Sequence, residues 1–212
     1  MKRKIIQVGN STQLVSLPRK WALQRNLKKS DEVEVIEKGE DLIIRTHSIP
    51  KAESVTVDVR KLNLLVGRYL VAAYRSGYDE VRIQYDRPEI LGFLQGLANK
   101  ILLGFELVSQ SEGTCVFRNV SENLSSEFDN VLRRVFFVTT ELAKNAYAAV
   151  SDGALERLPE VLALEMTNNR FSLFCERLLN KFGEQTFRKT TYLFLTVYEL
   201  EKIADHYKAI CN

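Results

Sequence analysis

The sequence predicts a multidomain α+β protein of 212 residues that is built from three consecutive segments. Short β-rich runs separated by turn residues occupy the first segment, up to about residue 48. Strand and helix patterns then alternate up to about residue 120, and apolar residues recur at helical spacing from there onward. These observations predict a β-rich domain over residues 1–48, a small α/β domain over 54–120 and an antiparallel three-helix bundle over 121–212.

The first segment is expected to contain four strands and one short helix. A β-rich run over residues 4–8 leads into the turn Gly9-Asn10-Ser11, and a second strand over 14–17 ends at Pro18. Residues 19–27 form the predicted helix, which Pro18 can begin because the first N–H of a helix has no partner. Strands over 31–37 and 41–45 follow. A segment this small buries too little surface to fold alone, so we expect a partner chain to complete it.

Charge is sharply separated within the first segment. Eight of the first thirty residues are Lys or Arg and none is Asp or Glu, whereas residues 31–41 hold six acids. The net charge of the whole chain is only +3, which hides this asymmetry. The phosphate backbone of a nucleic acid is the partner that fits such a surface, because each neutralised phosphate releases counterions. A solvated basic face without a partner is the alternative.

The second segment predicts strands over residues 54–59 and 80–85, helices over 62–75 and 88–103, and a closing hairpin of strands over 105–110 and 114–118. It has no Gly-rich phosphate loop, because Gly92 and Gly96 fall inside a predicted helix, where helix packing accounts for them. A pocket for a small ligand is an alternative role for this segment.

The third segment predicts three long helices, over residues 125–150, 158–182 and 186–210. Ser125 or Ser126 is expected to cap the first of them, and Gly153 and Gly183 separate the three. Helical spacing places Val135, Phe136 and Leu142 on the inner face of the first helix.

Composition and motifs exclude several classes of protein. No apolar run is long enough to cross a bilayer and no secretory signal is evident, so we expect a cytoplasmic protein without membrane insertion. Cys115, Cys175 and Cys211 are odd in number and scattered, which argues against a disulfide framework or a cysteine-rich zinc site. No nucleophile–base arrangement stands out, so we expect no enzyme.

Three motifs of the first segment follow one another in the order found in one family of DNA-binding domains. They are Val8-Gly9-Asn10-Ser11, Leu14-Val15-Ser16-Leu17-Pro18-Arg19-Lys20-Trp21 and Leu27-Lys28-Lys29-Ser30-Asp31-Glu32-Val33. This fifth of the chain resembles the AbrB/MazE type (SpoVT-AbrB). The resemblance implies a homodimer whose hairpins interleave into a swapped-hairpin β-barrel, with the first half of the segment on double-stranded DNA.

The residues predicted to contact DNA are basic or amide side chains: Lys2, Arg3, Lys4, Gln7, Asn10, Gln13, Arg19, Lys20 and Arg25. Gly9 and Asn10 have an alternative role in the turn itself, since both tolerate a positive φ. Trp21 is expected to anchor the interior of the domain rather than stack on a base.

The helical segment resembles one PhoU repeat through Leu132-Arg133-Arg134 and Glu201-Lys202-Ile203-Ala204-Asp205-His206. The order of all three segments resembles archaeal phosphate-uptake-type regulators, although those usually carry two repeats. The resemblance implies a divalent or Fe/Mn-type metal held by Glu201, Asp205 and Glu165. Asn169 departs from the pattern, since relatives tend to have an acid there. A solvated acidic pair bonded to Lys202 or Lys208 is the alternative.

Together these features predict a homodimeric or larger DNA-binding transcription regulator linked to phosphate uptake or metal-dependent signalling. One alternative is an adaptor that binds a partner protein, as an antitoxin or a phosphate-transport protein does, with the first domain serving for dimerisation. Another is a switch gated by a metabolite in the second segment.

Overall fold

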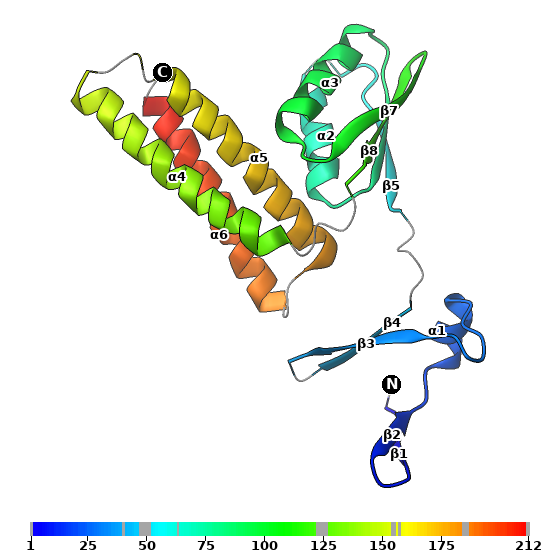
Figure 1. Cartoon of the computed structure of the whole chain (residues 1–212). Helices are drawn as coiled ribbons and strands as arrows, with labels where there is room; N and C mark the ends of the chain where they lie inside the picture. The colour runs from blue at the N-terminus through cyan, green and yellow to red at the C-terminus, as the bar shows by residue number, and fades with distance from the viewer. Residues whose placement is uncertain are drawn as a thin grey trace. The chain divides into compact units, whose positions relative to one another are not determined.

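The computed structural model describes residues 2–39, 41–46, 52–62, 64–121, 127–153, 156, 158–183 and 187–210. The fold is mixed α+β, with short strands in the N-terminal part and long helices in the C-terminal part (Figure 1). It divides into two compact units, Met1–Lys51 and Ala52–Asn212. The predicted boundary at residues 120 and 121 lies inside the second unit, where it follows the last strand.

The first unit consists of two separate hairpins and one short helix. β1 (Ile5–Val8) pairs antiparallel with β2 (Thr12–Val15), and β3 (Val33–Lys38) pairs with β4 (Asp41–Thr46). The helix α1 (Arg19–Gln24) lies between the hairpins in the chain. All five elements were predicted, but β2 begins and ends two residues before the predicted strand. Gly9 adopts φ +66°, which explains a glycine at the first turn.

This unit has no core of its own. None of its described residues is buried, and Ile6 and Leu14 are 57% and 50% exposed. Each hairpin forms a sheet of only two strands. A lone two-stranded hairpin is marginally stable in water, so the unit needs apolar surface from elsewhere to fold stably. The interleaved barrel stays a prediction, which the exposed apolar side chains of the hairpins favour.

The second unit begins with a four-stranded sheet in the order β5-β6-β8-β7. Its strands are β5 (Ser54–Asp58), β6 (Glu80–Gln84), β7 (Phe105–Ser111) and β8 (Thr114–Asn119). β5 and β6 run parallel, which requires a crossover, and α2 (Val66–Arg75) provides it. α3 (Glu89–Ile101) joins β6 to β7, and both helices lie on the same face of the sheet (Figure 1). Leu70, Ile83, Leu94 and Phe117 are among the fully buried residues between these layers.

Three long helices complete the second unit: α4 (Phe128–Ser151), α5 (Leu158–Phe182) and α6 (Phe187–Ile210). The three predicted helices are confirmed, while their predicted starts at Ser125, Ser126 and Thr186 lie outside the described residues, as does Cys211. Phe136 was wrongly placed on the inner face of α4, because it is 48% exposed beside the buried Val135. Neighbouring residues of a helix point about 100° apart, so only one of the two faces inward.

α5 packs against the other four helices that the structure describes in the second unit. Residues 172–179 are buried without interruption, because α4 and α6 pack on one side of α5 while α2 and α3 contact it on another. Within this stretch the Arg177 guanidinium donates hydrogen bonds to the carbonyl oxygens of Tyr74 at 2.8 Å and Tyr78 at 2.7 Å. It also lies over the ring of Phe105 at 5.2 Å from the ring centre. Burial lowers the pKa of Arg177. The helices and the sheet are therefore joined by a buried cation.

No helix in the described part of the chain has both the length and the apolar character needed to cross a membrane.

Candidate nucleic-acid interface

The two faces of the β1–β2 hairpin differ in composition, because the amides lie on one face only, together with Ile5 and Val15. In its register Ile6 lies opposite Leu14, and Gln7 lies opposite Gln13. Directly opposed residues of an antiparallel pair project from the same face, so both glutamines share one face and Ile6 and Leu14 share the other. Val8 adds a third apolar side chain to the second face, which we call the apolar hairpin face (Ile6, Val8 and Leu14). The hairpin can therefore bury the apolar hairpin face and present on the other face the two amides beside Ile5 and Val15.

Basic side chains lie before β1 and in α1, on either side of the hairpin in the chain. Lys2, Arg3 and Lys4 precede β1, and Arg19 and Lys20 form the first turn of α1. Trp21 is half-buried on the same helix, whereas every side chain predicted to contact DNA is exposed. Their exposure makes these groups available to a partner. Their roles in DNA binding stay predictions.

The basic side chains of this surface have no acidic partner in the described part of the unit. Among the described residues, the side chains of Lys2, Arg3, Lys4, Arg19, Lys20 and Arg25 make no ion pair with an acid. Asp31 instead accepts a hydrogen bond from the backbone N–H of Lys28 at 2.7 Å. Glu32, Glu34 and Glu37 are exposed on or next to β3. A polyanion such as duplex DNA can neutralise such a surface with a gain in counterion entropy.

Only two of the three predicted metal ligands lie in the same hollow. Glu201 and Asp205 on α6 line one hollow of about 450 Å³ together with Asn169 on α5. Glu165 is not among the residues that line it and instead pairs with Lys208, with 3.0 Å between Oε2 and Nζ. No group of three or more His, Cys, Asp or Glu side chains within the described ranges is gathered in a way that could hold a metal ion.

Cations already balance the acidic pair in this hollow. Lys202 Nζ lies 3.5 Å from Glu201 Oε2 and 3.7 Å from Asp205 Oδ2. Arg68 and Arg75 line the same hollow from α2. Burial, and after it the charge of Asp205, raises the pKa of Glu201. Two carboxylates, an amide and three cations make a poor donor set for a divalent ion, so these residues do not fit the predicted metal.

The match to a known family falls almost entirely on the first unit. Residues 6–53 match a family described as antidote-toxin recognition MazE, bacterial antitoxin. This match covers α1 and both hairpins except Ile5, and it includes Arg19, Lys20 and Arg25, whereas Lys2, Arg3 and Lys4 precede it. No curated protein and no solved structure matches the chain. The PhoU resemblance of the helices and the archaeal origin stay predictions.

The sequence reading missed a buried ion pair next to the hollow. Glu176 on α5 is 2% exposed, and its Oε2 lies 2.7 Å from Nε of Arg75 on α2. Burial raises the pKa of Glu176 to about 6, although the charge of Arg75 opposes this. The available signal was a Glu-Arg pair inside the apolar run Phe174-Cys175-Glu176-Arg177-Leu178-Leu179, where charged residues need buried partners.

Proposed function

We propose that the protein is a DNA-binding regulator that acts as a homodimer through its first unit. One observation carries the proposal: in the unit that matches the MazE family, the described residues form no core, and its basic side chains have no acidic partner among them. A second copy of the unit could bury its exposed apolar side chains, and a polyanion could neutralise its basic side chains. Domains of this kind dimerise and bind DNA or a toxin.

The apolar hairpin face is the part that the second copy is expected to cover. Ile6, Val8 and Leu14 are 57%, 50% and 50% exposed in the single chain. Burying the exposed half of such a side chain is worth about 1 kcal/mol, and both chains contribute. Part of this gain offsets the entropy of association. Dimerisation would leave the face with Gln7 and Gln13 toward the duplex.

The proposed contacts divide by chemistry. Lys2, Arg3, Lys4, Arg19, Lys20 and Arg25 position the protein on phosphates, which carries no sequence information. Gln7, Asn10 and Gln13 offer amides that can bond adenine edges or phosphate oxygens. Affinity should therefore depend mainly on salt, and sequence preference mainly on the amides.

Fluorescence anisotropy of a labelled duplex, titrated with the full chain at several salt concentrations, tests this assignment. The double variant Arg19→Ala with Lys20→Ala removes four cations from a dimer, so it should bind all duplexes more weakly and lower the slope of log affinity against log salt by about 3 to 4. The control is Arg82→Ala with Lys100→Ala, two exposed residues of the second unit that remove the same charge. If the Arg19 and Lys20 variant matches wild type at every salt concentration, the assignment is wrong.

The family description favours a second candidate, an antitoxin-like adaptor that binds a partner protein. The discriminating experiment combines affinity capture from native lysate with a mobility-shift assay on the same preparation. A stoichiometric protein partner without a duplex shift would favour the adaptor. A link to phosphate uptake is a further part of the proposal, and it rests only on the resemblance of the helices to a PhoU repeat.

A further inference from the structure

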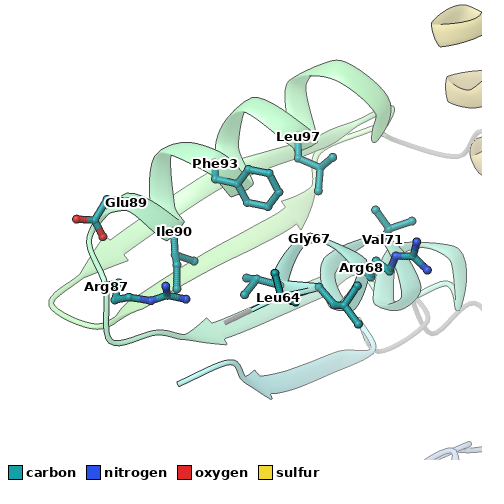
Figure 2. Close-up of a pocket in the computed structure, with 11 residues that line it drawn as sticks. Leu64, Gly67, Arg68, Val71, Arg87, Glu89, Ile90, Phe93 and Leu97 are labelled. Atoms are coloured by element: carbon teal, nitrogen blue, oxygen red, sulfur yellow. The ribbon is translucent and has the colours of Figure 1, made fainter. Parts of the chain in front are cut away.

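A second hollow, of about 510 Å³, lies between α2 and α3 in the second unit. Its volume falls within the range of pockets that hold small molecules, roughly 300–1,000 Å³. Figure 2 shows Phe93 and Leu97 projecting from α3 toward α2, above Leu64 and Gly67. The two helices that form this hollow also pack against the sheet through their buried residues.

The lining of this hollow is mainly apolar and partly open to water. Leu64 and Phe93, on opposite sides of it, are 78% and 57% exposed. Val71, Ile90 and Leu97 add further aliphatic surface. Large apolar side chains gathered around one concave site lose contact with water when a matching apolar molecule enters, which favours binding.

Two arginines lie toward opposite ends of the hollow, and only one of them is available to an anion (Figure 2). Arg87 Nη2 donates to the carbonyl oxygen of Leu62 at 2.6 Å, and Asp86 and Glu89 lie near its charge. Arg68 is exposed and also lines the hollow of Glu201 and Asp205, but its guanidinium makes no hydrogen bond or ion pair with any residue that the structure describes. A planar guanidinium that is free of partners suits a carboxylate, which it can bond through two parallel N–H groups.

We propose that this hollow binds a small apolar carboxylic acid, with its hydrocarbon part against Leu64, Phe93 and Leu97 and its carboxylate at Arg68. The charge complementarity decides between ligand classes. An amine would be repelled by Arg68, and a neutral alcohol would gain only the apolar contact. The proposal does not depend on DNA binding by the first unit.

Three probes of equal chain length separate these contributions: octanoate, octan-1-ol and octylamine, titrated into the full chain with labelled Leu and Val methyl groups. Octanoate should bind with a dissociation constant of about 1 mM or below. Its methyl shifts should centre on Leu64, Val71 and Leu97. Octan-1-ol should bind about fivefold more weakly and octylamine more weakly still.

Two variants complete the test. Arg68→Gln should weaken octanoate binding about fivefold and leave octan-1-ol unchanged. The matched control Arg82→Gln, on an exposed strand position outside the lining, should bind octanoate as wild type does. Absence of octanoate binding, shifts that map elsewhere, or equal affinity for octanoate and octylamine in the wild-type chain would each overturn the proposal. So would equal octanoate affinity in the two variants.

Discussion

Arg177→Met is the substitution that should most weaken the second unit. The side chain is 2% exposed and supplies the hydrogen bonds to the carbonyls of Tyr74 and Tyr78. Methionine fills similar volume but removes two charge-assisted hydrogen bonds, worth about 1.5–3 kcal/mol each, although the carbonyl oxygen of Tyr74 keeps the N–H of Gly77 as a donor at 3.0 Å. Asp79 keeps Lys181 as its partner, which limits the loss. We therefore expect the free energy of unfolding to fall by about 3–5 kcal/mol.

Urea and thermal denaturation followed by circular dichroism measure this loss. For a unit of this size each kcal/mol lowers the Tm by roughly 2–4 °C, so the expected change is about 6–20 °C. The control is Arg133→Met on the exposed side of α4, which should stay within about 0.5 kcal/mol of wild type. Equal stability of the two variants would refute the view that the buried guanidinium joins the sheet to the helices.

Three further predictions concern single contacts. Thr139→Val removes the acceptor, at 2.6 Å, of the buried Asn168 amide and should cost about 1–3 kcal/mol in urea denaturation, whereas the exposed Thr140→Val should cost little. The pKa of Glu176 is raised from 4.5 to about 6, so the folded state holds this proton more tightly and stability should fall by about 2 kcal/mol as pH rises from 4.5 to above 6. Glu176→Gln should remove that part of the pH dependence, and an unchanged pH profile would contradict the assignment. Leu14→Glu, on the apolar hairpin face, should abolish dimers in sedimentation velocity, whereas Val15→Glu on the amide face should retain them.

The secondary structure could be predicted from the sequence because its signals are local. The bounds of α5 were predicted to the residue, since helical periodicity and the break at Gly183 are visible within one stretch of chain. The burial of Glu176 and Arg177 was not predicted, because charged residues are usually exposed and the apolar run around them does not identify their partners. The partner carbonyl at Tyr74 also lies 103 residues away from Arg177.

The same contrast holds for the candidate sites: features within one segment were predicted, and contacts between segments were not. The acid-free basic segment and its exposure follow from composition, and the family match, which begins at residue 6, covers this segment except Lys2, Arg3 and Lys4. The grouping of Glu165 with Glu201 and Asp205 was expected from the resemblance, but Glu165 pairs with Lys208. Which carboxylate meets which cation depends on how α5 and α6 rotate against each other, and helical spacing within one helix does not determine that.

Sedimentation velocity of the full chain, alone and with a fluorescent duplex, tests the central claim most directly. We expect the protein alone to sediment with the mass of two 24.3 kDa chains, and the duplex at low salt to gain the mass of two chains. A single species of one chain that leaves the duplex free at low salt would contradict the account.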